Sequence, residues 1–138
     1  MHKIIKKVLS HFINPIQSIK FDIRKLLFLF KKYKLTRVYN IDFQINESLF
    51  EPDYCDLDNL INFVLKHKPR LLLELGGGYS TLAIAYALNV LEKNEGHKYK
   101  FITYDQSKDY LKQTKDLIPE NLKKNIEFRF SPLKAEIY

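Results

Sequence analysis

The sequence predicts an α/β fold in which a parallel sheet of three strands follows a basic, helical N-terminal extension. Three apolar segments with the character of strands, at 71–75, 101–104 and 126–130, alternate with segments of helical periodicity. The connections are short, and such strand–helix–strand units make right-handed crossovers between parallel strands. A run of three glycines, at 76–78, directly follows the first strand. Helices are therefore expected to pack on the sheet, with a glycine turn at its edge.

The composition indicates a folded protein of a reducing compartment. Hydrophobic residues make up 46% and aromatic residues 14% of the 138 positions, which excludes a disordered chain. The single cysteine, Cys55, has no partner for an intrachain disulfide. No signal-peptide pattern follows Met1, and the longest apolar run, at 26–30, is far too short to span a bilayer. We expect a cytoplasmic protein.

The net charge of +7 is concentrated at the N-terminus. Residues 1–37 contain ten basic residues and one acid, Asp22, whereas residues 38–138 contain thirteen basic and fifteen acidic residues. The globular part is therefore nearly neutral, and a nucleic-acid partner is not favoured.

The basic extension has two amphipathic patterns. The first places its apolar residues on one helical face and ends before Pro15; the second runs from Ile19 to Phe30 among lysines and arginines. Such a segment can pack on the domain or on a second subunit of a homo-oligomer. It can equally lie on an anionic membrane surface, which would make the protein membrane-peripheral through residues 1–36.

The next segments predict a strand and a helix. Ile41, Phe43 and Ile45 alternate with polar residues, as in a half-buried strand. A helix is expected to follow with Asp56 as N-cap and to stop before Pro69. Its apolar stripe consists of Leu57, Leu60, Ile61, Val64 and Leu65.

The remaining elements belong to the predicted sheet and its helices. Residues 71–75 are expected to form a strand buried on both faces. Ser80 or Thr81 is expected to cap the next helix, which residues 94–97 interrupt. Ser107 is expected to cap a helix stabilised by Tyr110, Leu111, Thr114, Leu117 and Ile118. Pro119 should end that helix, and Pro132 should end the third strand.

The glycine turn and one carboxylate indicate a nucleoside site. Ligands of open parallel sheets bind beyond the carboxyl ends of the strands, so the loops after Leu75, Tyr104 and Phe130 should carry the chemistry. Three glycines let the backbone turn sharply and approach a ligand. Asp105, directly after the second strand, can accept hydrogen bonds from two ribose hydroxyls.

The segment Glu74-Leu-Gly76-Gly-Gly78-Tyr-Ser80 resembles the first motif of the class I S-adenosylmethionine-dependent methyltransferases, acidic-x-Gly-x-Gly-x-Gly, except that Ser80 stands at the last glycine position. The resemblance implies a Rossmann-like sheet and S-adenosyl-L-methionine as cofactor. It places Glu74 near the ammonium and carboxylate end of the cofactor and the glycines under its methionine and ribose parts. The cofactor-binding set that it implies is Glu74, Gly76, Gly77, Gly78, Tyr79, Ser80, Asp105 on the ribose and Gln106 at the adenine edge, with a weaker assignment of Ser131 to the adenine.

The resemblance covers residues 69–131 and accounts for part of such a domain. We divide the chain into the extension at 1–36, a strand and connecting segment at 37–55, and a partial Rossmann-like domain at 56–138. Class I methyltransferases usually have seven strands, so the later ones are expected beyond Tyr138 or from a partner. A truncated chain of this kind should be marginally stable and catalytically silent. The catalytic residues are unknown, and the methyl acceptor, small-molecule or glycan-type, stays open.

Two other functions remain as alternatives. A dinucleotide-binding NAD(P) oxidoreductase would have the pattern G-x-G-x-x-G, of which Gly76 and Gly78 match, but Thr81 occupies the third position. Glu74 adds a charge where such enzymes usually have an apolar residue, and the 27 residues from Gly78 to Asp105 exceed the roughly 20 of that pattern. A non-enzymatic interaction module could retain the turn for packing alone.

We predict no metal site. The acidic residues Glu51, Asp53, Asp56 and Asp58 lack the central glycine and terminal glutamate of a calcium-binding loop. Helix capping and the dipole of a helix N-terminus explain these carboxylates better. The four histidines are scattered and have no cysteine near them, so no zinc site is expected.

Overall fold

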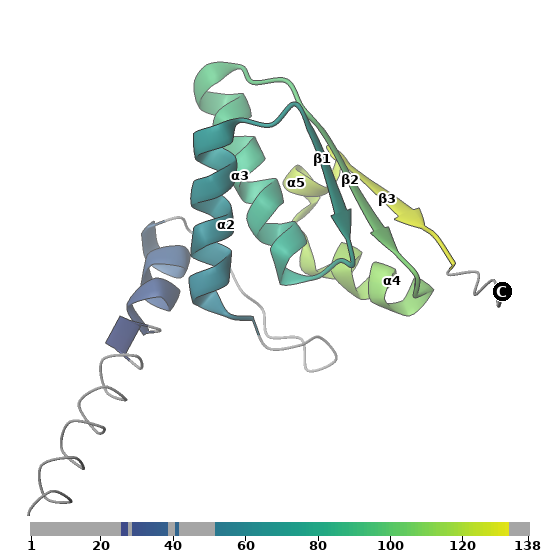
Figure 1. Ribbon diagram of the computed structural model, residues 1–138, viewed down its shortest axis with the longest axis horizontal. Coiled ribbons are helices and arrows are strands. Elements are labelled where there is room, and N and C mark those ends of the chain that lie inside the picture. Colours follow the sequence, from purple (N-terminus) through teal and green to yellow (C-terminus); the bar gives the residue numbers. More distant parts are fainter. Residues whose placement is uncertain (1–25, 28, 39–40, 42–51, 133–138) are drawn as a thin grey trace, which may run out of the picture.

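The computed structural model describes residues 26–27, 29–38, 41 and 52–132. A parallel sheet with the strand order β1-β2-β3 forms its centre, and helices precede and connect the strands (Figure 1). The elements in chain order are η1 (Lys34–Val38, a π-helical turn), α2 (Tyr54–His67), β1 (Leu71–Leu75), α3 (Tyr79–Glu95), β2 (Lys100–Asp105), α4 (Lys108–Leu117), α5 (Glu120–Lys123) and β3 (Ile126–Phe130).

The predicted α/β architecture is confirmed. Strand β2 lies between β1 and β3 and runs parallel to both, with Leu75 opposite Tyr104 and Asp105 opposite Phe130. The carboxyl ends of the three strands therefore meet at one edge of the sheet. This arrangement is consistent with a Rossmann-like fold.

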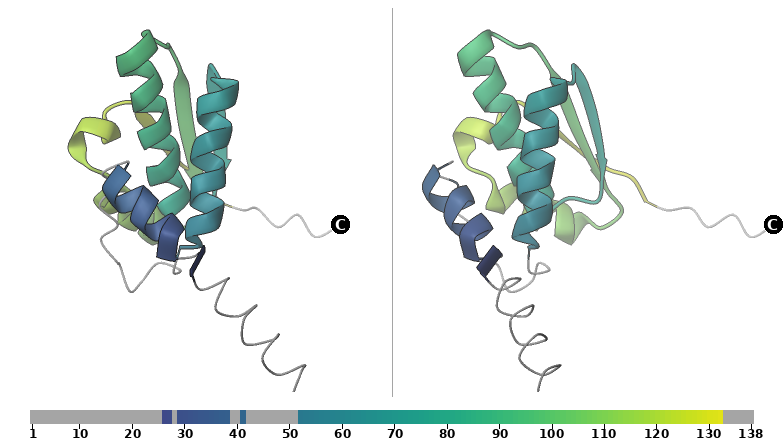
Figure 2. Two further views of the ribbon diagram at one scale, coloured as in Figure 1. Left: turned by 90° about the vertical axis from the view of Figure 1, so that its left-hand side faces the viewer. Right: turned by 60° about the vertical axis from the view of Figure 1, so that its left-hand side comes forward.

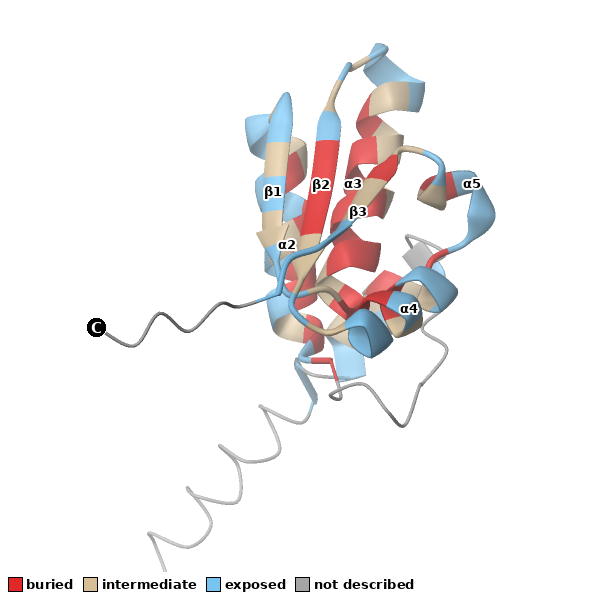
Figure 3. Ribbon diagram, turned by 90° about the vertical axis from the view of Figure 1, so that its right-hand side faces the viewer, coloured by how far each residue is buried: buried red, intermediate tan, exposed pale blue. Residues whose placement is uncertain are grey.

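The described helices lie on one face of the sheet, and the opposite face is open. The views in Figure 1 and Figure 2 place the helical layer on one side, and Figure 3 looks onto the open side with the strands in front. In β1, Leu71, Leu73 and Leu75 are exposed, whereas Leu72 is half-buried and packs against the core. The prediction that this strand is buried on both faces is wrong, because only one face has helices over it within the described residues.

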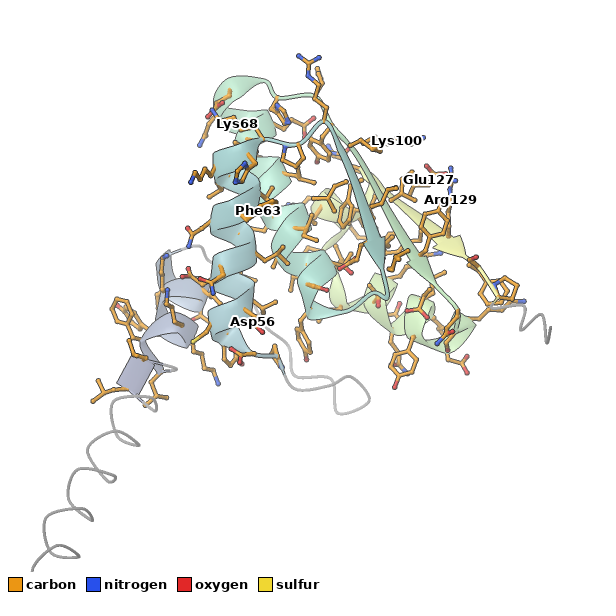
Figure 4. All side chains as sticks on the ribbon, in the orientation of Figure 1. Asp56, Phe63, Lys68, Lys100, Glu127 and Arg129 are labelled. Atoms are coloured by element: carbon orange, nitrogen blue, oxygen red, sulfur yellow. The ribbon has the colours of Figure 1, made fainter. Side chains whose placement is uncertain are left out.

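The open face changes from apolar to charged across the sheet. Its β1 side carries the three exposed leucines, while Glu127 on β3 pairs with Lys100 at 3.5 Å and with Arg129 at 2.5 Å. Arg129 also donates a 2.8 Å hydrogen bond to the hydroxyl of Tyr104. Figure 4 shows Lys100, Glu127 and Arg129 beside one another. The β3 side of this face is thus a solvent-exposed network of polar side chains.

Helix α2 begins earlier than predicted. Asp53 is its N-cap, and its side chain accepts hydrogen bonds from the backbone N–H groups of Cys55 and Asp56. The prediction of Asp56 as N-cap is wrong because Tyr54, which is buried in the core, already belongs to the helix. The predicted apolar stripe is confirmed in that Leu57, Ile61 and Val64 are buried.

The other helix ends largely follow the sequence. Helix α3 is buried around most of its circumference and ends at Gly96, whose left-handed backbone (φ 66°) glycine adopts more readily than other residue types. Ser107 caps α4 by accepting from the N–H group of Tyr110, and α4 stops before Pro119. The short helix α5, immediately after this proline, was not predicted.

Residues 26–27 and 29–33 are helical and continue into η1. This segment lies against α2 on the side away from the sheet (Figures 1 and 2). Leu35 is fully buried, and its carbonyl oxygen accepts from the N–H group of Ile41 at 3.1 Å. The first amphipathic pattern, Pro15 and residues 43–45 of the predicted strand lie outside the described residues.

A buried ion pair joins this segment to the domain. Asp58 on α2 has no exposed surface, and its two carboxylate oxygens accept hydrogen bonds from Lys31 and, at 2.6 Å, from Lys34. Burial alone would raise the pKa of Asp58. The two lysines outweigh it and hold the pKa of the carboxyl below its ordinary value of 3.8. The charged form of Asp58 is therefore favoured by folding.

Asp58→Asn should lower the free energy of unfolding by about 2 kcal/mol, since hydrogen bonds to charged groups contribute about 1.5–3 kcal/mol. Because its folded pKa is depressed, the Asp58 contribution is present above pH 3.8 and lost as the pH falls through the lower folded value. Urea unfolding of both proteins at neutral and acidic pH measures this difference. Asp56→Asn, at an exposed position of the same helix, is the control. Equal losses of stability in Asp58→Asn and Asp56→Asn would contradict a stabilising contact of Asp58 with the two lysines.

Candidate functional site

A pocket of about 720 Å³ lies at the carboxyl ends of the strands. This volume is within the range of small-molecule sites. The first helical turn of α4 adds a wall to it. The lining residues are Leu75, Gly76, Gly77, Tyr104, Asp105, Gln106, Tyr110 and Ser131.

Two glycines of the turn occupy positions that disfavour a side chain, each for a different reason. Gly76 has a φ of 85°, a conformation that L side chains rarely adopt. A Cβ atom on Gly77 would lie 2.7 Å from Oγ1 of Thr114, a buried residue of α4. Gly76 is therefore favoured by its backbone conformation, and Gly77 by the close approach of the turn to α4.

The N–H groups of all three glycines are hydrogen-bonded within the protein. That of Gly76 donates to the carbonyl oxygen of Tyr104 at 2.8 Å, and that of Gly77 donates to Oδ2 of Asp105 at 3.1 Å. The N–H group of Gly78 donates to Oγ1 of Thr81 at 3.0 Å. A pyrophosphate bound at such a turn needs these donors. The turn can therefore contact a ligand closely, but its three glycine N–H groups are not available to bind an anionic group.

Asp105 ties the turn to β2 and keeps capacity for a ligand. Its Oδ2 accepts from Gly77, and its Oδ1 accepts from the N–H group of Ser107 at 2.8 Å. A carboxylate has about four acceptor positions, so roughly two remain for other donors. Since Asp105 lines the pocket, these positions suit two neighbouring hydroxyl groups.

Glu74 points toward the helical layer and not into the pocket. Oγ of Ser80 and Oγ1 of Thr81 each donate a 2.6 Å hydrogen bond to its carboxylate. The serine at the last glycine position of the motif therefore has a defined partner. Burial raises the pKa of Glu74, and the charge of Asp105 raises it further, against a partial lowering by the neighbouring hydroxyls of Ser80, Thr81 and Thr103.

The predicted cap of α3 is wrong. The helix begins at Tyr79 with Gly78 as N-cap. The hydroxyls of Ser80 and Thr81 lie inside the first turn, where they reach Glu74 on β1. Thr81 is fully buried at this contact, so the close approach of helix and strand is made through a hydrogen bond and needs no third glycine.

The structure brings half of the predicted cofactor-binding set to the pocket. Gly76, Gly77, Asp105 and Gln106 line it. The other four, Glu74, Gly78, Tyr79 and Ser80, are not on its wall, and Tyr79 is buried in the core. Their contact with a cofactor stays a prediction.

Four lining residues were not assigned firmly from sequence. Tyr110 was taken as part of the apolar stripe of α4, yet 38% of its surface is exposed and it faces the pocket. The sequence signal for Tyr110 was its position three residues after the Ser107 cap. A residue there lies in the first turn of α4, which is next to the carboxyl ends of the strands. Leu75 and Tyr104 are the last apolar residues of their strands, and Ser131 follows β3.

Within the described residues no group of three His, Cys, Asp or Glu side chains could hold a metal ion. Asp53 caps α2 and Asp58 binds two lysines, whereas Glu51 lies outside the described part. None of the described helices combines the length and the apolar character needed to cross a membrane.

No model of a protein family matches the chain, and none of the curated proteins matches it either. The evidence for function is therefore the geometry of the pocket.

Gly77→Ala should destabilise the protein by about 1–3 kcal/mol, the usual result of overpacking. Thr114→Ala should recover most of this loss, because it removes the two nearest atoms, and Oγ1 of Thr114 has no hydrogen-bond partner within the described structure. Chemical unfolding of the single and double variants gives the coupling free energy. Additive effects would show that the turn is not packed against Thr114.

Glu74→Gln should change how stability depends on pH. Because folding raises the pKa of Glu74, its ionisation opposes folding, and this part of the stability falls as the pH rises above the ordinary value of 4.5. The glutamine variant should lack that decrease, as measured by thermal unfolding from pH 4 to pH 8. A parallel pH dependence in both proteins would contradict the raised pKa.

Proposed function

We propose that the pocket binds S-adenosyl-L-methionine and that the chain is the cofactor-binding part of a class I methyltransferase. The observation that supports this most is the meeting of the glycine turn, Asp105 and Tyr110 in one pocket at the strand ends. The Asp105 carboxylate can accept from ribose hydroxyls, the Tyr110 ring can contact a base, and the glycine backbone leaves room for the sugar. These groups together are complementary to a nucleoside that carries no phosphate.

Each lining group has a role in this proposal. Asp105 accepts from the ribose hydroxyls, and Gly76 and Gly77 leave room for the sugar and the methionine portion. Tyr110 and Gln106 form the adenine side. The bound cofactor supplies a methyl group on a sulfonium centre, ready for in-line transfer to an acceptor that is held close and aligned. No described residue is assigned to that acceptor.

Glu74 acts in this proposal by positioning the turn. Its bonds to Ser80 and Thr81 fix the start of α3 against the end of β1. The glycines between these two anchors then have a fixed path along the pocket. Preorganisation of this kind lowers the conformational entropy that binding would otherwise cost.

The NAD-dependent alternative is less well supported. A dinucleotide needs N–H donors for its pyrophosphate, and the three glycine N–H groups already have protein acceptors. The buried Thr81 also occupies the helix–strand contact that the dinucleotide pattern reserves for glycine.

Calorimetric titration with S-adenosylhomocysteine should show binding, while NAD should give no heat. Asp105→Ala should weaken the binding at least about 100-fold, since it removes two hydrogen bonds to a charged group. Asp116→Ala, at an exposed position of α4, should bind as the unaltered protein does. Heat with NAD alone would overturn the proposal, and heat with neither ligand would favour a non-enzymatic module.

Tyr110→Ala should weaken S-adenosylhomocysteine binding about tenfold, because a base stacked on an aromatic side chain gains about 1–3 kcal/mol. Tyr110→Phe keeps the ring and should bind nearly as well as the unaltered protein. The same titration measures both. A larger loss in the phenylalanine variant would show that the hydroxyl, and not the ring, contributes to the site.

A further inference from the structure

The helix before η1 exposes a large apolar surface. Leu26, Leu27, Leu29, Phe30 and Tyr33, here called the outer stripe, are each more than half exposed. Their spacing of three, four and seven residues places most of them on one side of the helix. An apolar side of this size on one helix indicates an interaction surface.

The ion pair with Asp58 imposes this orientation. Lys31 and Lys34 bind the buried carboxylate, and Lys32 lies 5.3 Å from the centre of the Tyr54 ring. These lysines are on the side of the helix that faces α2, as is the buried Leu35 of η1. Turning the outer stripe inward would leave a buried carboxylate without its partners. The helix therefore has its charged side against the domain and its apolar side in solvent.

The surrounding charge indicates what covers the stripe. The residues before the stripe, 1–25, include six basic residues and one acid, and Arg37 just after it is exposed. An apolar stripe within a basic segment is complementary to a layer with anionic groups above an apolar interior. Two copies of the chain would instead bring two strongly positive extensions together, which opposes self-association.

We propose that the outer stripe docks on the surface of an anionic phospholipid bilayer. Leucine and aromatic side chains of the stripe enter the interface, and the net positive charge of residues 1–37 favours a surface of anionic lipid. The Asp58 ion pair then links the docked helix to α2 and holds the strand-end pocket at the membrane surface. This proposal does not depend on the ligand of that pocket.

Vesicle flotation of the full chain tests it. The protein should float with vesicles of phosphatidylcholine and phosphatidylserine and stay behind with phosphatidylcholine alone. Added salt should weaken the binding, because it screens the basic residues. The double variant Leu29→Ser, Phe30→Ser should bind at least about tenfold more weakly, since binding scales with apolar area.

A matched variant separates the stripe from apolar surface in general. Leu73→Ser, Phe63→Ser removes a leucine and a phenylalanine that are 57% and 55% exposed on β1 and α2, against 54% and 60% for Leu29 and Phe30. It should bind the anionic vesicles as the unaltered chain does. Equal loss in both double variants, or no binding by the unaltered chain, would overturn the proposal. So would a dimer, seen by sedimentation velocity without vesicles, that Leu29→Ser, Phe30→Ser abolishes.

Discussion

The site depends on how two carboxylates fix a three-residue turn. Glu74, at the end of β1, accepts from two hydroxyls in the first turn of α3, and Asp105, at the end of β2, accepts from the N–H group of Gly77. The first contact sets where α3 begins, and the second sets how far the turn lies from the neighbouring strand. The two carboxylates repel each other, which adds to the raised pKa of Glu74. The glycine turn is thus held at one side by Glu74 and at the other by Asp105, and the pocket lies beside it.

This anchoring also decides which ligands the turn can serve. A turn with free amides attracts phosphate, whereas this one has used its three glycine amides on protein acceptors. What it offers is a backbone with no Cβ atom, next to a carboxylate with unused lone pairs and a tyrosine ring. The surface of this pocket is complementary to hydroxyl groups and to a flat ring, and the carboxylate of Asp105 makes it negative. It should therefore prefer a cationic or neutral nucleoside to an anionic one.

The fold and part of the site were accessible from sequence because their signals are local. The stripe of α2, the Ser107 cap and the acidic residue at the end of β2 each depend on residues a few positions apart. The errors have a different origin. Asp53 and Asp56 are equally good caps by residue type, and the buried Tyr54 decides between them. Likewise, an apolar run such as 71–75 shows that a strand is present but not how many faces are covered. Asp58 finds its lysines 24 and 27 residues away, a contact that no local pattern indicates.

The extension shows how such a distant contact can reverse the expected packing of a helix. An amphipathic helix normally buries its apolar side, and periodicity alone would place the leucines of residues 26–30 against the domain. Here one buried carboxylate selects the opposite orientation, because leaving Asp58 unpaired is more unfavourable than leaving several apolar side chains partly exposed. An arrangement that keeps apolar surface in water has no benefit for the isolated domain. The arrangement becomes favourable if a lipid layer buries the exposed side of the helix. The lysines then hold the helix on the domain while the leucines and Phe30 contact the lipid.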